Sequence, residues 1–382
     1  MACRLLAKGN PSCLLGPLKI PGSSQHNGAS SPPLLPPEES NMKKRYSVVI
    51  GAIAAASLAC VAGVASAQVK ELRILESGGP SGEATEEAYI APFTARTGIK
   101  VVRESPTSLG KLQAMVASKS VTSVLVELGS TNLFQARASG LLEPLDWNKI
   151  NPDPMFPEAK LADGFGYQYF STIMAWPKGT KAVNSWADFW NVKDFPGKRA
   201  LPDYAGYTLP LALLADGVKP ENLYPLDIDR AFKSLDKIKA NVAVWWKAGA
   251  QPPQLLEDGE IQYSAAWSGR IVGNAKLDYT YKQGFLQVSY FAVPKGASPE
   301  AKEAAMGLLH EMSKADNQIK ATRTIPYTGA SPDIQAKIPA DKLDDYPTSP
   351  NNKAVQALAD PSWTANNAKE IERRWQEFKL SM

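Results

Sequence analysis

Cysteine and histidine, the side chains that most often supply a nucleophile, a general base or a soft metal ligand, are scarce in this sequence. The chain has 382 residues, with cysteine only at Cys3, Cys13 and Cys60 and histidine only at His26 and His310. All of these except His310 lie in the first 67 residues. A catalytic triad or a zinc site beyond that point would have a single histidine to use. We therefore expect no catalytic residue, no metal site and no cofactor.

A glycine-rich loop is the first feature that could bind a ligand. The stretch 76–82 reads ESGGPSG and stands between a predicted strand and a predicted helix. Such a turn presents backbone N–H groups and hydroxyls to an anion or a carboxylate. A tight strand-to-helix turn without a ligand explains the same residues. The candidate binding residues are Ser77, Gly78, Gly79 and Ser81, together with Ser130 and Thr131 at the start of a later predicted helix.

Residues 42–67 have the pattern of a signal peptide. Three basic residues (43–45) precede an apolar run, and Ala65 and Ala67 are the small residues of a cleavage site, so we expect cleavage after Ala67 and a periplasmic location. A retained membrane anchor is the main alternative, but Ala and Gly insert weakly compared with Leu and Ile. A lipoprotein cut before Cys60 is less favoured. Residues 1–41 are proline-rich and of low complexity, and we predict that they are a non-native N-terminal extension.

Removal of residues 1–67 on export changes the net charge and the length of the chain that folds. Six of the 42 basic residues and two of the 38 acidic residues lie in residues 1–67, so the remaining chain has 36 of each and no formal net charge. The basicity of the full chain therefore gives no reason to expect a nucleic-acid partner. The remaining 315 of the 382 residues are too many for one ordinary core and suit two lobes.

Strand and helix patterns alternate in the first part of the exported chain. Strands are predicted at 69–77, 99–105 and 121–128, with helices at 83–97 and from Ser108 between them. This β-α-β-α-β order predicts a mainly parallel sheet with crossover helices. Further strands are predicted at 167–176, 242–246, 260–267 and 285–296, and further helices at 185–191, 226–241, 298–314 and near the C-terminus.

Five stretches and the C-terminal helix carry a resemblance to a known family. The stretches are FTARTGIKVV, VNSWADFWN, FPGKRALPD, LLEDGEIQYSAAWSGR and YFAVPKGASPEAKEAAMGLLHEM, and the terminal helix contains Trp375. Their order and spacing resemble the bacterial extracellular solute-binding family of ABC importers that includes the periplasmic spermidine/putrescine receptors. The resemblance covers nearly all of residues 69–382.

The resemblance implies a two-lobed α/β periplasmic-binding-protein fold, with a central ligand cleft and hinge strands that cross between the lobes. It places the crossings near Met174–Lys178 and Ser289–Pro294. Lobe 1 is then 69–175 with about 290–328, and lobe 2 is 176–289 with about 329–382. The implied partners are a small solute and the membrane permease subunits of an ABC transporter, and we expect a monomer.

Several cleft positions depart from those of the polyamine-binding relatives. A polyamine, the family's default ligand, needs carboxylates for its ammonium groups. In this sequence Tyr204 and Tyr207 stand near the expected carboxylate positions, and Gln287 and Ser289 stand where the relatives have a Trp and an Asp. The missing carboxylates favour an anionic or zwitterionic small molecule.

Three further residues complete the predicted site. Trp267 and Tyr327 match stacking residues of the relatives, although packing in the core would explain both as well. Arg270 follows Trp267 by three residues and is suited to hold a carboxylate or a phosphate, although a surface position is common for arginine.

Other classes of function stay open at this point. A ferric-ion or iron-chelate receptor of the same fold would use Tyr204 and Tyr207 as phenolates and the 77–82 loop to hold an anion. A structural protein of the cell envelope would need no ligand, and a secreted enzyme is a remote alternative because the required side chains are missing.

Overall fold

The computed structural model describes residues 69–382. The predicted extension, signal peptide and cleavage site therefore lie outside the described residues. Three parallel strands open the described chain, β1 (Glu71–Leu75), β2 (Lys100–Glu104) and β3 (Leu125–Gly129). Between them run α2 (Gly79–Thr85), the π-helical turn η2 (Glu86–Ile90), α3 (Ala91–Thr97) and α4 (Leu109–Ala117). The predicted β-α-β-α-β order is confirmed.

Local signals in the sequence set the ends of these helices. The backbone of Gly98 is left-handed (φ 73°) at the end of α3, which favours glycine there. The Ser108 side chain accepts a hydrogen bond from the Lys111 N–H and caps α4. The later helix α11 (Pro299–Ser313) begins with Ser298 as its cap and proline at its first position.

The middle of the chain builds a second parallel group of strands. These are β7 (Arg199–Pro202), β8 (Val242–Trp246) and β9 (Tyr263–Trp267). The helices around them are α7 (Trp186–Trp190), α8 (Ala205–Ala215), α9 (Ile228–Ile238) and α10 (Gln251–Glu257). A large core, which includes Trp186, Leu209 and Trp375, lies among these elements.

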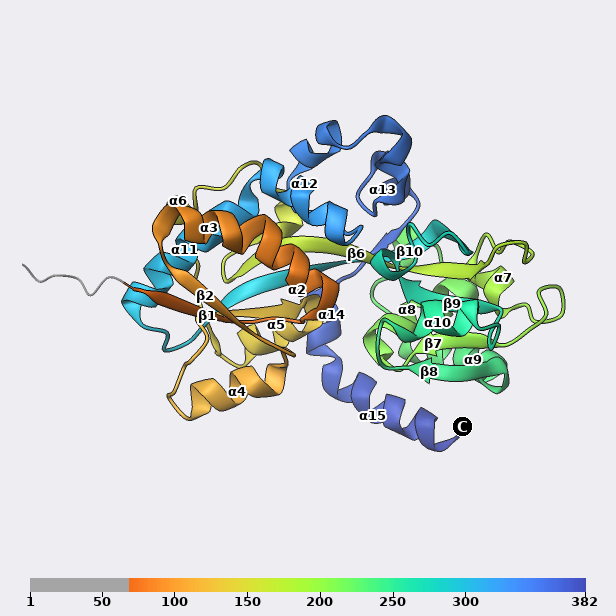
Figure 1. The fold of residues 1–382 in the computed structure, drawn as a ribbon. Helices are drawn as coiled ribbons and strands as arrows, with labels where there is room; N and C mark the ends of the chain where they lie inside the picture. Colours follow the sequence, from red (N-terminus) through yellow and green to blue (C-terminus); the bar gives the residue numbers. More distant parts are fainter. Residues whose placement is uncertain (1–68) are drawn as a thin grey trace, which may run out of the picture. The chain divides into compact units, whose positions relative to one another are not determined.

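Two long antiparallel strands join the two groups. They are β6 (Gly164–Pro177) and β10 (Leu277–Pro294), and the strand order is β2-β1-β3-β10-β6-β9-β7-β8. Strand β10 pairs with β3 through Ser289–Ala292, and β6 pairs with β9 through Thr172–Ala175. Figure 1 shows both strands passing between the half that holds β1 to β3 and the half that holds β7 to β9. A two-lobed α/β fold is therefore present, while the residue numbers of the lobe boundaries stay a prediction.

The remaining elements cover the sheet and connect the two halves. Two helices at the C-terminus matter for the site, because α14 (Pro361–Asn366) packs against α5 (Ser130–Ala138) and α15 (Ala368–Leu380) packs against α8. The other elements are β4 (Leu142–Glu143), α6 (Trp147–Ile150), η3 (Pro157–Ala159), β5 (Lys160–Leu161), η4 (Pro220–Asn222), η5 (Lys239–Asn241), η6 (Ser268–Arg270), α12 (Ala315–Thr324), η7 (Pro332–Lys337), η8 (Ala340–Asp345), α13 (Pro350–Ala354) and β11 (Ala357–Leu358).

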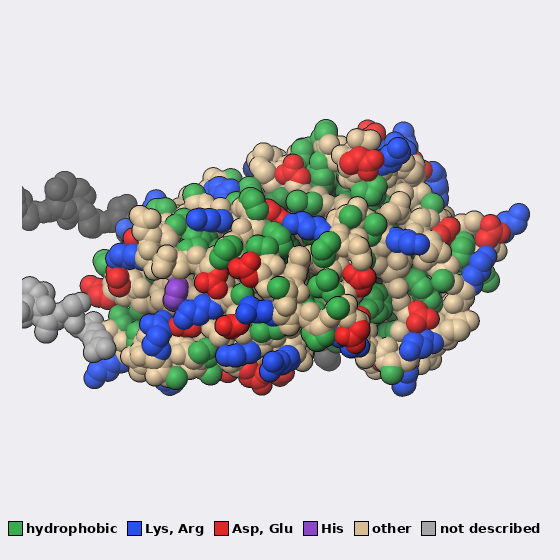
Figure 2. Space-filling model, turned by 90° about the horizontal axis from the view of Figure 1, so that it is seen from above, with side chains coloured by type: hydrophobic (Ala, Val, Ile, Leu, Met, Phe, Trp, Pro, Cys, Tyr) green, Lys and Arg blue, Asp and Glu red, His purple; other side chains and the backbone are tan. Residues whose placement is uncertain are grey.

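The displayed surface is mixed in charge, and the single described histidine makes a structural contact. Figure 2 shows basic and acidic side chains interspersed on the displayed face, with no large area of one sign. The Nδ1 atom of His310 lies 2.9 Å from the carbonyl oxygen of Ile150, so this histidine ties α11 to the end of α6. Within residues 69–382, no helix is both long enough and apolar enough to span a bilayer.

Candidate ligand-binding site

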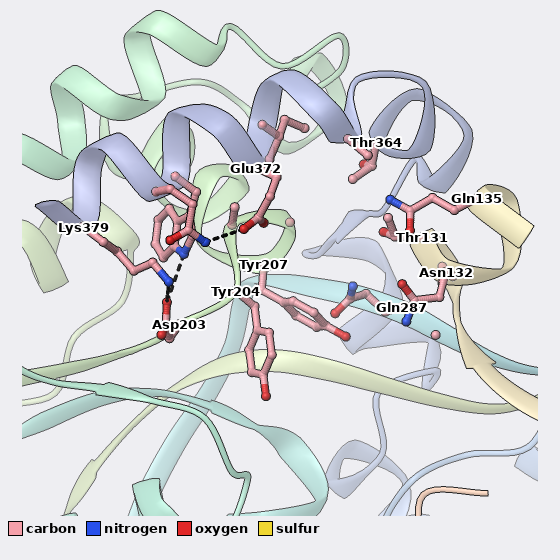
Figure 3. Close-up of a pocket in the computed structure, with 18 of the residues that line it drawn as sticks. Thr131, Asn132, Gln135, Asp203, Tyr204, Tyr207, Gln287, Thr364, Glu372 and Lys379 are labelled. Atoms are coloured by element: carbon pink, nitrogen blue, oxygen red, sulfur yellow. Dashed lines mark hydrogen bonds and ion pairs between the residues drawn. The ribbon is translucent and has the colours of Figure 1, made fainter. Parts of the chain in front are cut away.

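A cleft of about 490 Å³ opens where the N-termini of α5 and α8 face each other and the C-terminal helices pass by. Six of the thirteen predicted site residues line it, namely Ser130, Thr131, Tyr204, Tyr207, Trp267 and Gln287. In Figure 3, Thr131, Asn132 and Gln135 lie on one side of the cleft, and Tyr204 and Tyr207 project from the other. Residues from both halves of the sheet therefore meet at one site.

Aromatic rings form the side of the cleft that belongs to the half with β7 to β9. The ring of Trp267 stacks on that of Tyr204 with centroids 6.4 Å apart, and it lies 6.1 Å from the ring of Tyr207. The back of Trp267 packs against the buried Trp246 at 5.1 Å. Trp267 thus both lines the cleft and packs against the core, so the two interpretations drawn from its sequence position are compatible.

The two tyrosines are placed as neutral phenols. The Tyr204 hydroxyl donates a hydrogen bond of 2.6 Å to the carbonyl oxygen of Lys247. Burial raises the pKa of Tyr204 and of Tyr207 above the ordinary value, which disfavours the phenolates that would bind ferric iron. Among residues 69–382, no group of three or more His, Cys, Asp or Glu side chains is placed to hold a metal ion. These contacts give the ferric-ion alternative little support.

Both carboxylates that line the cleft already have partners in the protein. The Trp375 indole N–H donates to Asp203 at 3.0 Å, and the ammonium groups of Lys379 and Lys247 lie 3.4 and 3.5 Å from the same carboxylate. The Glu372 carboxylate accepts a hydrogen bond from Gln376. Figure 3 shows the contact of Asp203 with Lys379 and the hydrogen bond at Glu372, both on the α15 side of the cleft. Asp203 is therefore neutralised within the protein, whereas the exposed Glu372 has a neutral partner and keeps its charge.

The glycine-rich loop lies outside this cleft lining, and two of its N–H groups, those of Ser77 and Gly78, are in use. The Ser77 N–H donates to the buried carboxylate of Glu127 at 2.7 Å, and the Gly78 N–H donates to Glu76 at 2.7 Å. Gly78 and Gly79 have left-handed backbones (φ 78° and 58°), which explains the glycines by the turn alone. These contacts favour the tight-turn interpretation of the loop.

The remaining predicted residues surround the cleft without lining it. The Ser81 hydroxyl donates to Gln168 at 3.0 Å, and Ser289 is buried where β10 pairs with Gly129. Tyr327 is buried against Phe170, with ring centroids 5.7 Å apart. Arg270, in η6, is close enough to Tyr327 to affect the pKa of its phenol. Whether these residues bind a ligand stays a prediction.

Sequence reasoning missed the part of the cleft that the C-terminal segment supplies. Thr364 and six residues of α15 line it, as do Asn132 and Gln135 on α5. The two polar residues follow Ser130-Thr131 on the same helix, so helical spacing could have suggested them. No local signal marks the contribution of α15, because it depends on how the terminal helix packs against α8.

A cleft between two α/β halves that are joined by crossing strands is the architecture of a solute-capturing receptor. A family model described as bacterial extracellular solute-binding protein matches residues 88–354. The chain belongs to this family, and it is a substrate-binding subunit of an ABC transporter.

Named relatives of this chain include proteins for amino-acid-like ligands. The Gamma-aminobutyric acid-binding protein of Pseudomonas aeruginosa is 36% identical over 327 residues, which are 82% of this chain and 92% of that protein. The Spermidine/putrescine-binding periplasmic protein of Escherichia coli is 24% identical over 272 residues, which are 65% and 76%.

Solved structures agree in fold over most of the chain. A protein described as a GABA receptor matches with a TM-score of 0.75 and 31% identity, covering 81% of this chain and 97% of that one. A binding protein of A. tumefaciens in complex with agropinic acid matches with a TM-score of 0.72 and 31% identity, covering 81% and 98%. The similarity therefore extends across both halves of the cleft.

Proposed function

We propose that this receptor captures a small zwitterionic or anionic solute of the amino-acid type, with γ-aminobutyrate as the first candidate. The observation that carries the proposal is that Asp203, the buried carboxylate of the cleft lining, already accepts from Trp375 and faces two lysines, which leaves the exposed Glu372 as the other carboxylate of the lining. A polyamine needs a carboxylate for each ammonium group, so it would have to break the Asp203 contacts or leave an ammonium group unpaired, which is costly where that group is buried.

The relatives support the same class of ligand. The bacterial relative with 36% identity is named for γ-aminobutyric acid, and one similar structure holds agropinic acid. The hydroxyls, amides and aromatic faces of this cleft suit a short ligand with one carboxylate and a short carbon chain. The E. coli polyamine receptor is a more distant relative, at 24% identity.

The location, the oligomeric state and the permease partner are part of the same proposal, and the family supports them. The protein acts in the periplasm after cleavage behind Ala67, as a monomer, and passes its solute to the permease subunits of its transporter. It performs no chemistry on the solute. The predicted site residues outside the cleft lining, such as Ser77 and Ser81, act by supporting the site.

A thermal-shift panel on the purified protein tests the ligand class. The panel contains γ-aminobutyrate, α-amino acids, organic acids, putrescine and spermidine, each followed by calorimetry where the melting temperature rises. A true ligand at 100 times its dissociation constant adds about 2.7 kcal/mol to the free energy of unfolding. Binding of a carboxylate-bearing solute is expected. Tight binding of putrescine or spermidine, with no response to any carboxylate, would refute the proposal.

A further inference from the structure

One face of the central sheet carries a row of side chains that leads from one half of the fold to the other. In the β10–β6 pairing Gln287 lies opposite Phe170, and in the β6–β9 pairing Thr172 lies opposite Trp267. Directly opposed residues share a sheet face, and so do residues two apart on one strand. Gln287, Phe170, Thr172 and Trp267 therefore face the same side, and the outer two line the cleft.

Three polar groups in this row have no hydrogen-bond partner within residues 69–382. They are the amide oxygen of Gln287, the hydroxyl of Thr172 and the indole N–H of Trp267. Gln287 is 6% exposed and Thr172 is fully buried. A buried polar group without a partner destabilises a protein by roughly 1–3 kcal/mol, so such groups are expected to be satisfied when a site is occupied.

The unpartnered groups differ in kind along the row. At the β9 end, the Trp267 indole can only donate, and the guanidinium Nε of Arg270 is a second buried donor without a partner in the described chain. At the β10 end, the unpartnered atom of Gln287 is an acceptor. Donors with a positive charge at one end and an acceptor at the other match a ligand with a carboxylate and an ammonium group.

An ionisable group lies beyond each end of the row, Glu127 at the β3 end and Arg270 at the β9 end. Glu127 on β3 lies opposite Phe291 of β10, on the face that carries Gln287, and its carboxylate accepts from Ser77 and Tyr167. Tyr327 lies within reach of both charges. Burial raises its pKa to about 12, the charge of Arg270 acts to lower this pKa, and Glu127 acts to raise it. Tyr327 therefore lies between a guanidinium near the β9 end of the row and a buried carboxyl group near the β3 end.

We propose that the cleft binds its zwitterionic ligand in one orientation, with the ammonium group on the amide oxygen of Gln287 and the carboxylate on Trp267 and Arg270. Arg270 lies outside the cleft lining in this structure, so the proposal requires closure of the two halves to bring it to the carboxylate. The inference rests on the proposed function, because it assumes that the ligand carries both charges. It assigns Gln287 and Arg270 as the residues that distinguish a zwitterion from a diamine or a simple acid.

Two substitutions test the orientation with three probes. The probes are γ-aminobutyrate, butyrate, which lacks the ammonium group, and putrescine, which has a second ammonium group in place of the carboxylate. Gln287→Glu places a negative charge beside the proposed ammonium site, so affinity for γ-aminobutyrate is expected to hold or rise and putrescine binding to appear. Arg270→Gln is expected to weaken γ-aminobutyrate binding at least tenfold, in line with roughly tenfold or more for a charge-assisted hydrogen bond.

The outcomes separate this inference from the proposed function. If the protein binds γ-aminobutyrate but Gln287→Glu abolishes that binding, or if Arg270→Gln leaves it unchanged, the orientation is overturned and the ligand class survives. If the unaltered protein binds putrescine and none of the carboxylate-bearing probes, the proposed function fails and the orientation fails with it.

Matched controls separate binding effects from folding effects. Gln254→Glu on α10 and Arg230→Gln on α9 make the same chemical changes at exposed positions, so they should leave binding unchanged. Arg270→Lys keeps the positive charge and should recover part of the affinity that Arg270→Gln loses. Thermal unfolding without a ligand confirms that each variant is folded before its affinity is measured.

Discussion

Asp203 lines the cleft, but its contacts are with other residues of the protein and hold two elements together. Its side chain is 6% exposed, accepts a hydrogen bond from Trp375 and faces the ammonium groups of two lysines. An acid in the lining of a cleft could be expected to meet a cationic ligand. Its contacts instead tie the loop ahead of α8 to the C-terminal helix, so the acid is already neutralised.

Asp203→Asn is therefore expected to lower stability more than it changes ligand affinity. The substitution leaves Lys379 and Lys247 without their carboxylate, although the amide oxygen can still accept from Trp375. Loss of a charged partner from a buried hydrogen-bonded group costs about 1–3 kcal/mol. Urea unfolding measures the change. Asp229→Asn, which removes an exposed carboxylate paired with Arg374, should leave stability nearly unchanged, and an equal effect of the two would contradict this role.

At the scale of elements, the C-terminal helix α15 is part of the second half of the fold. Trp375 is 2% exposed and stacks on Phe378 at 5.5 Å, and both rings contact Trp245 and Phe232. The side chains of α15 that face the cleft are on the same helix as this aromatic cluster. Packing of the helix therefore positions one wall of the site.

Trp375→Ala is expected to destabilise the protein by about 3–5 kcal/mol, the usual cost of removing a large buried aromatic side chain. It also removes the N–H that Asp203 accepts. Chemical denaturation gives the magnitude, and binding measured at low temperature shows whether the cleft wall survives. Glu377→Ala, at an exposed position two residues further along, serves as the control. A loss below about 1 kcal/mol at Trp375 would mean that α15 is only loosely attached.

At the scale of the whole molecule, ligand capture requires the two halves to approach each other. Strands β6 and β10 are the connections that allow one half to rotate on the other. A side-chain carbon added at Gly129, at the start of α5, would lie 4.0 Å from the hydroxyl of Tyr207 on α8. The two halves are therefore close to contact at this point of the cleft.

Gly129→Leu should keep the halves apart and weaken ligand binding by about tenfold or more, because closure must then displace the Tyr207 ring. Gly129→Ala makes only ordinary contact at 4.0 Å and should bind as the unaltered protein does. Small-angle scattering with and without ligand measures closure, and calorimetry measures affinity. Unchanged closure and affinity in Gly129→Leu would show that this contact does not limit the closed form.

The order of strands and helices could be read from the sequence, because the signals involved are local. Apolar periodicity, serine caps at Ser108 and Ser298 and the left-handed glycine at Gly98 act within a few residues, and they predicted the order of the elements. The bounds were less accurate, because β10 begins at Leu277 and not at 285, and the helix predicted at 83–97 begins at Gly79 and includes a π-helical turn. The scarcity of cysteine and histidine likewise needed no structure. These features determined the fold class and the kind of protein.

The composition of the site was decided by tertiary structure. The sequence could not show whether the predicted Ser77–Gly79 loop or Gln287 is available to bind a ligand. A backbone N–H or an amide oxygen can bind a ligand only if no other group of the protein already occupies it. Glu127 and Glu76 accept from the N–H groups of Ser77 and Gly78, whereas the Gln287 oxygen has no partner in the described chain. Such pairings join strands that are distant in sequence, and only the folded chain determines them.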